Sequence, residues 1–155
     1  NQDTVIYENE WRGKKAPDLR VQPVNSRGGV LLSEQRDVRP VLLAVLNTQL
    51  VTSQQMIEVL QELHRGIPAS DLLILVVSHR EEPDALRAAV KAKEIRFLIG
   101  KADSPVEPYK DALSPTVFAI DHTGVIRKAL VGNDAGKADN LRLIARGLVN
   151  SAKRR

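Results

Sequence analysis

The chain of 155 residues contains no cysteine. Disulfide bonds, thiolate metal sites and thiol catalysis are therefore excluded. Aromatic residues make up only 3% of the sequence, so the core must be built from Leu, Val, Ile and Ala. The same scarcity argues against binding of single-stranded nucleic acid, because bases need aromatic side chains on which to stack.

Long apolar runs are also absent. No stretch approaches the ~18 apolar residues of a membrane span, and no signal peptide is recognisable in this sequence. The first residue is Asn1 rather than Met, so we expect the sequence to be processed or cut from a longer chain. The net charge is +4, from 23 basic and 19 acidic side chains, and the last three residues are "KRR". We expect this short basic tail to be a solvated end.

Two continuous apolar runs of strand length predict central strands. They are "RPVLLAVLN", residues 39–47, and "DLLILVVSH", residues 71–79. Because neither run alternates with polar residues, both faces of each strand should be covered. A turn at residues 25–29 predicts an early β-hairpin. Residues 114–132 predict a second antiparallel hairpin, and "IRFLIG", residues 95–100, predicts a short strand.

Helical periodicity occurs between these strands and after the last one. A helix should begin near Ser53, with Thr52 or Ser53 as its N-cap. Residues 81–94 predict a helix with acidic side chains early and lysines late, which suits the helix dipole. Residues 104–113 should hold one or two helical turns, and the last helix should run over 137–150. The residues expected to face inward are Met56, Val59, Leu60, Leu63, Leu86, Ala89, Val90, Leu141, Ile144, Ala145 and Leu148.

The order of elements predicts an α/β fold. Parallel β-α-β units that finish in an antiparallel hairpin and a closing helix give a mixed central sheet with helices on both faces. A short polar junction, "NTQLVTSQQ" at residues 47–55, lies between the first apolar strand and its helix. Such junctions commonly carry the chemistry of α/β proteins, yet this one has no Cys, His, carboxylate or glycine-rich loop.

The histidines form no recognisable metal site. His64, His79 and His122 lack zinc-ligand spacing. His79 precedes "REE" at the carboxyl edge of the predicted sheet, where ligands of α/β proteins collect. A metal or acid–base pair of His79 with a glutamate is one interpretation, and a solvated loop is the favoured one.

The serines and glycines indicate no catalytic or phosphate-binding motif either. No serine lies in a Gly-x-Ser-x-Gly elbow. Gly28 and Gly29 belong to a turn and not to a phosphate-binding loop. We therefore predict no cofactor and no metal. The serines in question are Ser53, Ser78 and Ser114.

Three stretches resemble the thioredoxin superfamily, in particular its TlpA/ResA-like branch of extracytoplasmic thiol-disulfide proteins. "GKKAPDLRVQPVNSRGGVLLSE", residues 13–34, is similar to the opening of that branch. "RPVLLAVLNTQLVTSQQMIEVLQEL", residues 39–63, is similar to its active-site strand and helix. "LSPTVFAIDHTGVIRKALVG", residues 113–132, resembles its cis-proline loop and closing hairpin, and is the most specific of the three.

The resemblance implies a thioredoxin-like fold with a mixed central sheet flanked by helices and an N-terminal β-hairpin extension. The domain should cover residues 13–150, between an N-terminal arm at 1–12 and the basic tail at 151–155. The resemblance also implies an extracytoplasmic, periplasmic location in a bacterium, with no signal or anchor in this segment.

The resemblance further implies a redox site that has lost its chemistry. When Met56 anchors the alignment, Gln49 and Thr52 stand where the family has its two cysteines, and Thr48 replaces the preceding tryptophan. Gln55 stands where this branch often has an acid that helps to move protons. The vestigial active-site positions are thus Thr48, Gln49, Leu50, Val51, Thr52 and Gln55.

Pro115 is the main candidate for a binding role. By resemblance its peptide bond with Ser114 is cis, and the neighbouring backbone pairs with an extended peptide. The alternative is that Pro115 only shapes a turn. The free amides at residues 52–54 are able to hold an anion, although simple capping is favoured. The expected partner-binding residues are Leu113, Ser114, Pro115 and Thr116.

Three functions follow from these observations. The favoured one is a redox-inactive binding or scaffolding domain that docks an extended peptide or partner protein beside Pro115. The second is a structural module of a larger assembly that uses another face. The third is an enzyme with non-thiol chemistry, for which no constellation is present. An exposed apolar patch around Leu50, Val51 and Leu113 favours the first function, and a patch on a helix face favours the second.

Overall fold

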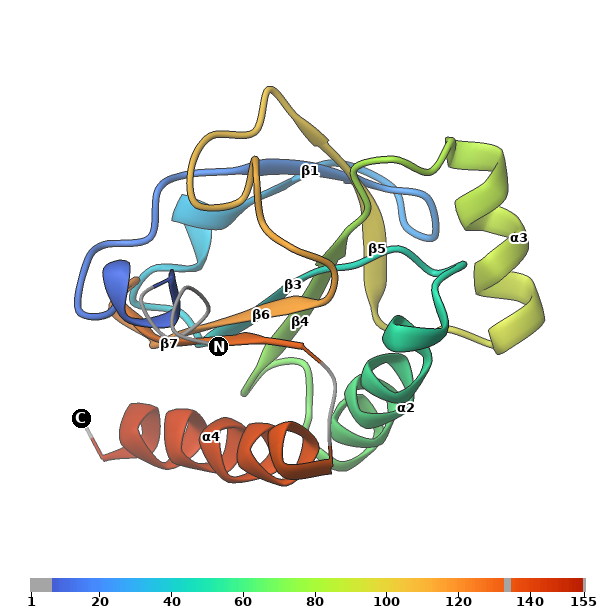
Figure 1. Ribbon diagram of the computed structural model, residues 1–155. Helices are drawn as coiled ribbons and strands as arrows, with labels where there is room; N and C mark the ends of the chain where they lie inside the picture. The colour runs from blue at the N-terminus through green and yellow to red at the C-terminus, as the bar shows by residue number, and fades with distance from the viewer. Residues whose placement is uncertain (1–6, 133–134, 155) are drawn as a thin grey trace.

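The computed structural model of the protein describes residues 7–132 and 135–154. Seven strands of these residues form one mixed sheet in the order β2-β1-β5-β4-β3-β6-β7 (Figure 1). Strands β3, β4 and β5 run parallel, and the other neighbouring pairs are antiparallel. The predicted mixed sheet and N-terminal hairpin are confirmed. The strands are β1 (Arg20–Pro23), β2 (Val30–Leu31), β3 (Val41–Val45), β4 (Leu73–Val77), β5 (Leu98–Asp103), β6 (Thr116–Ile120) and β7 (Ile126–Val131).

Helices α2 (Val51–Gly66), α3 (Pro83–Lys93) and α4 (Ala135–Lys153) pack into one apolar cluster on one face of the sheet. The connections β3-α2-β4 and β4-α3-β5 step across the sheet in the same direction, so right-handed crossovers place both helices on the same side. The other face is covered by the 3-10 helix η1 (Leu32–Gln35), the N-terminal segment and Tyr109. Residues 7–10 of that N-terminal segment are helical, so this face carries short helical segments and loops, whereas the three long helices lie on the other face.

Strand β3 shows why the sequence contains a continuous apolar run. All five of its residues are buried. Leu42 and Ala44 face the cluster beneath the helices, whereas Val41, Leu43 and Val45 face the opposite cluster. A strand that is covered on both faces has no solvent side, so its residues do not alternate with polar ones.

The apolar faces of the helices agree with the sequence pattern. The predicted inward residues that are buried are Met56, Val59, Leu60, Leu63, Leu86, Ala89, Leu141, Ala145 and Leu148. Val90 and Ile144 are partly buried and pack against the same cluster. Helix α4 continues through residue 153, into the segment that the sequence assigns to the basic tail. Among the described residues no helix is long and apolar enough to cross a membrane.

The start of α2 differs from the prediction. Its N-cap is Leu50, not Thr52 or Ser53, and no side chain caps it. The reason lies in Asn47, whose side-chain oxygen accepts a hydrogen bond of 2.9 Å from the Gln49 amide. The Leu50 amide also donates to the Asn47 carbonyl, at 3.2 Å. Asn47 thus forms a turn over residues 47–50, since an Asn side chain can bind nearby backbone amides and so compete with helical hydrogen bonds. The helix begins directly after this turn, at Val51.

The segment of residues 104–113 forms turns and holds one helical hydrogen bond, from the Lys110 amide to the Val106 carbonyl at 2.9 Å, so the predicted helix does not extend beyond a single turn. Two prolines interrupt it, and a proline lacks the amide that a helix needs. The peptide bond between Glu107 and Pro108 is cis, as is the bond between Ser114 and Pro115. The turns direct Tyr109 into the core, where its ring packs edge-on against Phe118 at 5.5 Å and its hydroxyl donates to the Pro17 carbonyl at 2.7 Å.

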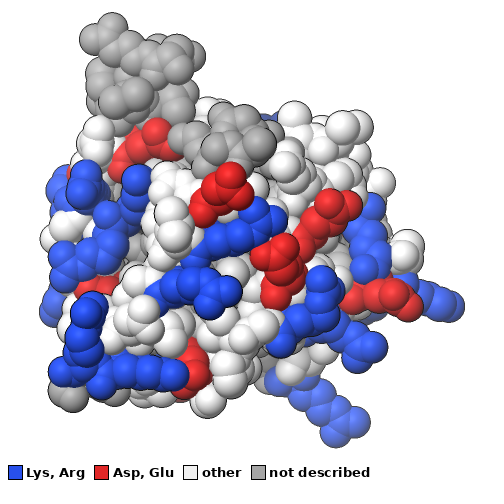
Figure 2. Space-filling model, turned by 90° about the horizontal axis from the view of Figure 1, so that it is seen from below, with Lys and Arg blue, Asp and Glu red and all other residues white. Residues whose placement is uncertain are grey.

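The face formed by α2 and α4 carries charges of both signs, with acidic side chains lying among the basic ones (Figure 2). Arg142 forms ion pairs with Glu62 and Asp139. Lys153 pairs with Asp71 across 3.4 Å. Because these basic side chains have acidic neighbours, the surface is not a uniform basic patch of the kind that tracks a phosphate backbone.

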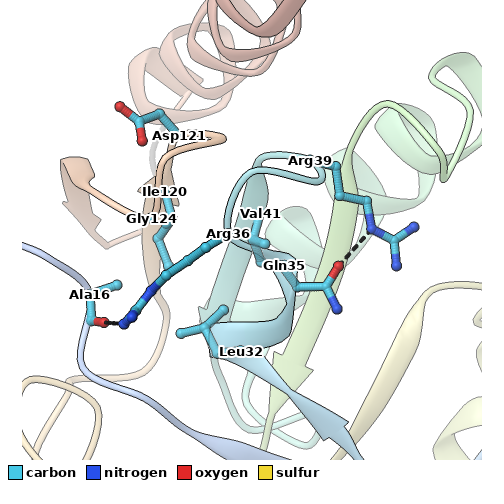
Figure 3. Close-up of a pocket in the computed structure, with 9 residues that line it drawn as sticks. All are labelled: Ala16, Leu32, Gln35, Arg36, Arg39, Val41, Ile120, Asp121 and Gly124. Atoms are coloured by element: carbon cyan, nitrogen blue, oxygen red, sulfur yellow. Dashed lines mark hydrogen bonds between the residues drawn. The ribbon is translucent and has the colours of Figure 1, made fainter.

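A very small pocket, of about 10 Å³, lies between η1 and the β6–β7 turn (Figure 3). The Arg36 side chain crosses it and donates to the Ala16 carbonyl at 3.1 Å. Gly124 has a φ of +89°, and a Cβ there would lie 2.7 Å from Arg36 Cγ. Glycine thus permits both the turn and the close approach of Arg36. The pocket is a packing contact between the N-terminal segment and the hairpin, and we assign it no ligand.

Asp121 organises the turn between β6 and β7. One carboxylate oxygen accepts hydrogen bonds from the Thr123 amide and hydroxyl and from the Val125 amide, at 2.7–3.1 Å. The other accepts from Arg127 at 2.6 Å. Burial alone would raise the pKa of this carboxyl, but the hydrogen bonds and the guanidinium outweigh burial and lower the pKa. The ionised carboxylate therefore stabilises the folded chain.

Asp121→Asn is expected to lower the free energy of unfolding by about 2 kcal/mol at pH 7, because charge-assisted hydrogen bonds are lost. The folded pKa lies below the unfolded value of about 3.9. The contribution is thus complete above that pH and is lost as pH falls through the folded pKa. Urea unfolding followed by circular dichroism should show a smaller difference in the free energy of unfolding between Asp121→Asn and the parent chain at pH 3 than at pH 7. The exposed Asp139→Asn is the control, and an equal deficit at both pH values would refute this role.

Candidate functional site

The polar junction between β3 and α2 is held by a buried carboxylate from another loop. Glu81, which follows β4, is only 6% exposed, and Thr48 is 1% exposed. The Thr48 amide donates to one Glu81 oxygen at 2.6 Å, and the Thr48 hydroxyl donates to the other. The Ser78 hydroxyl donates to the first oxygen at 2.8 Å. The junction therefore carries a structural network that fixes its position against the neighbouring strand.

The loop that carries Glu81 is itself fixed on both sides. The Lys101 ammonium donates to the carbonyls of His79 and Glu81, at 2.8 and 2.7 Å. The His79 ring donates from Nε2 to the Tyr109 carbonyl, at 2.7 Å. The prediction of a solvated loop is wrong for Glu81, which is buried, while Arg80 remains exposed. No group of three acidic or histidine side chains among the described residues is arranged to hold a metal.

The loop before β6 meets the same junction. The Ser114–Pro115 peptide bond is cis, the isomer that the resemblance implies. The Ser114 hydroxyl accepts from the Asn47 amide at 2.8 Å and lies 3.5 Å from the Ser53 hydroxyl. Pro115 is buried, whereas Leu113 is exposed. The two groups of residues singled out in the sequence, 48–55 and 113–116, thus lie together.

An open groove of about 480 Å³ runs between these segments. Three apolar side chains remain exposed at the junction and its loop: Leu50 is 43%, Val51 85% and Leu113 59% exposed. Leu50 and Leu113 line the groove directly. The residues that line it are Val45, Leu46, Asn47, Leu50, His79, Arg80, Lys110, Asp111, Ala112, Leu113 and Ser114.

Backbone groups at the rim of the groove remain available. Within the described residues, no hydrogen bond engages the amides of Leu113 and Ser114 or the carbonyl of Ser114. The Leu113 carbonyl, in contrast, accepts from the Thr116 hydroxyl. An extended peptide that lies along residues 113 and 114 is able to satisfy these free groups, since main-chain pairing is how peptides bind at strand edges.

The expected vestigial positions and their neighbours differ in solvent exposure. Gln49 precedes the helix, and Gln49, Thr52 and Gln55 are exposed. Ser53, in contrast, is completely buried, and its amide donates to the Leu50 carbonyl at 3.0 Å. Residues 50 and 53 thus form the first turn of α2. The alignment through Met56 assigns the two cysteine positions to Gln49 and Thr52. In the structure, the first turn of α2 instead joins Leu50, which is exposed, to Ser53, which is buried, one residue later in each case.

Two double variants distinguish these registers. Leu50→Cys with Ser53→Cys is expected to close an intramolecular disulfide after mild oxidation, because both positions lie in one helical turn. A disulfide needs Cα atoms about 4.4–6.8 Å apart. Gln49→Cys with Thr52→Cys, the pair that the sequence alignment predicts, should close less readily. Free-thiol titration with mass spectrometry of the linked peptide measures both. Preferential closure of the second pair would restore the original alignment.

No family model matches the sequence, and no curated protein matches it. Among solved structures, the chain is similar to a thiol-disulfide isomerase from Corynebacterium glutamicum, with a TM-score of 0.73 and 21% identity over 88% of this chain and 96% of the other. A secreted thiol-disulfide isomerase from the same organism gives a TM-score of 0.71 and 16% identity, covering 86% and 84%. A thioredoxin-family thiol:disulfide interchange protein from Chlorobium tepidum gives 0.72 and 16%, covering 89% and 97%. The fold of this chain is thioredoxin-like.

The thioredoxin-like fold occurs here without the residue on which thiol-disulfide exchange depends. Exchange proceeds by attack of a thiolate on a disulfide sulfur, and the chain has no cysteine. Leu50 and Ser53 occupy the first turn of α2. The site therefore combines a strand-to-helix junction, a proline loop and an open groove with no thiol nucleophile.

Proposed function

We propose that this domain is a redox-inactive binding module that docks an extended segment of a partner protein in the groove beside Pro115. The observation that carries the proposal is the combination of exposed apolar side chains at Leu50, Val51 and Leu113 with free backbone groups at 113 and 114. Apolar side chains supply affinity when buried. Main-chain pairing fixes the direction and register of the bound segment.

The alternative of a structural module that uses another face has less support. Leu143 is 71% exposed on α4, far along the chain from the groove residues. Arg142 precedes it in the chain, and Arg146 follows three residues later on the same helix. A single exposed leucine among charged side chains is ordinary, whereas several that border one groove indicate an interaction site.

We further propose an extracytoplasmic location for the domain. The support is the likeness in fold to the secreted thiol-disulfide isomerase from Corynebacterium glutamicum. We also propose that residues 48–55 are the remnant of a thiol-disulfide site. This site has lost thiol-disulfide exchange and has kept the ability to bind a peptide.

Leu113→Asn is expected to weaken peptide binding at least tenfold, because a polar amide of similar size replaces an apolar contact in the groove. Phage-displayed peptides selected on the immobilised protein provide the ligands, and fluorescence anisotropy of labelled peptides gives the dissociation constants. Leu143→Asn, at an exposed leucine on α4, is the matched control and should leave affinity unchanged. If Leu143→Asn weakens binding and Leu113→Asn does not, the structural-module alternative is favoured.

A further inference from the structure

The groove combines its apolar side chains with two cationic ones from different segments. Arg80 lies in the loop between β4 and α3, and Lys110 lies in the connection between β5 and β6. The hydrogen bond from the His79 ring to the Tyr109 carbonyl joins these two segments. Arg80 and Lys110 are the next residue along each segment, and both are exposed and line the groove.

Neither cation forms an ion pair within the part of the chain that the structure describes, although the charge of Lys110 acts on the Glu107 carboxyl. No hydrogen bond or ion pair there engages the Arg80 or Lys110 side chain. Asp111 also lines the groove, but its carboxyl shares a hydrogen bond with Glu107. That hydrogen bond, together with partial burial and repulsion between the two carboxyls, raises the pKa of Glu107. Asp111 thus places one acidic side chain on a groove that carries two basic ones.

The backbone that presents Arg80 is held in place before any ligand binds. Lys101 donates to the carbonyls on either side of Arg80, those of His79 and Glu81. The Glu81 carboxylate is bonded to Thr48 and Ser78. A ligand therefore meets a loop that is already ordered, so little conformational entropy is lost when it binds.

We infer that the segment docked in this groove is acidic: an extended peptide with a carboxylate side chain for Arg80 and Lys110 next to an apolar side chain for Leu50 and Leu113. This inference rests on the proposed function and adds the chemistry of the partner. Two unpaired cations on one groove attract an anion. The apolar side chains and the free amides of residues 113 and 114 select a peptide over a small inorganic anion, which has no apolar or main-chain contact to make.

The test uses three capped peptides that differ only in charge. Their centres are Leu-Glu-Asp, Leu-Gln-Asn and Leu-Lys-Lys, each flanked by Ser-Val and Val-Ser. Titrations of the isotope-labelled protein, followed by amide NMR shifts, give affinities and the residues affected. Inorganic phosphate at the same ionic strength is the small-anion probe. The variants are Arg80→Glu and Lys110→Glu, with Lys91→Glu on the exposed side of α3 as the matched control.

The acidic peptide is expected to bind about five- to tenfold more tightly than the neutral one at low salt, as expected for two partly exposed ion pairs. The advantage should shrink at high salt, be lost in either groove variant and persist in Lys91→Glu. Equal affinity for the neutral peptide, with shifts still in the groove, would overturn the acidic preference and leave the docking function intact. Phosphate that reproduces the same shifts with the same affinity would overturn the peptide assignment. If no peptide perturbs the groove, both proposals fail.

Discussion

Gly100→Ala is expected to lower the free energy of unfolding by about 4 kcal/mol or more, which is among the largest effects of a single substitution. Gly100 lies in β5 opposite Pro23 of β1. A Cβ at this position would lie 1.9 Å from the Gln22 carbonyl oxygen and 2.6 Å from Pro23 Cα. Both are backbone atoms, so no side chain is able to rotate away. Strand β1 must separate from β5, and the N-terminal hairpin is displaced from the sheet.

Urea unfolding followed by far-ultraviolet circular dichroism measures this effect. Gly66→Ala is the matched control, because nothing lies within 4 Å of a Cβ built on Gly66. That substitution should change stability by no more than about 0.5 kcal/mol. A Gly100→Ala variant that unfolds at the same urea concentration as the parent chain would show that β1 does not approach β5 as described.

Glu81→Ala is expected to cost about 3 kcal/mol and to weaken peptide binding at the groove. The substitution leaves the Thr48 amide, the Thr48 hydroxyl and the Ser78 hydroxyl without their acceptor. Buried donors left unpaired cost about 1–3 kcal/mol each. Relaxation and water entry recover part of that sum. The junction then loses its attachment to the β4–α3 loop, so both sides of the groove become less ordered.

Two further substitutions make this prediction specific. Glu81→Gln keeps one acceptor oxygen and should cost less than Glu81→Ala. Glu82→Ala, at an exposed neighbour whose side chain caps nothing, should change stability by about 0.5 kcal/mol or less. Stability comes from urea unfolding, and affinity comes from anisotropy with the selected peptides. If Glu81→Ala and Glu82→Ala behave alike, the buried carboxylate does not organise the site.

The sequence pattern was sufficient for the central strands and the apolar faces of the helices. A continuous apolar run such as Val41–Val45 is buried completely only in a central strand, where both faces of the sheet are covered. Helical spacing likewise fixed the buried faces of α2 and α4. These features follow from the period of apolar residues, which is a local property of the chain.

The details of the site depended on contacts between distant residues and were harder to predict. Asn47 forms a turn that sets where α2 begins, so counting back from Met56 does not fix the positions of the first helical turn. In the charged stretch "REE", Glu81 is expected to be a surface residue. Its burial is possible because Thr48, 33 residues away, supplies two hydrogen-bond donors. A serine three residues before it, directly after a central strand, was the available signal.

Amide hydrogen exchange at Leu113 and Ser114, with and without a bound peptide, tests the docking proposal most directly. In the free protein these two amides have no partner among the described residues and should exchange rapidly. A bound extended peptide that pairs with this backbone is predicted to slow exchange at one or both of them, while residues 141–149 in α4 remain unchanged. Unaltered exchange at residues 113 and 114 under saturating peptide, or protection confined to α4, would contradict docking in the groove.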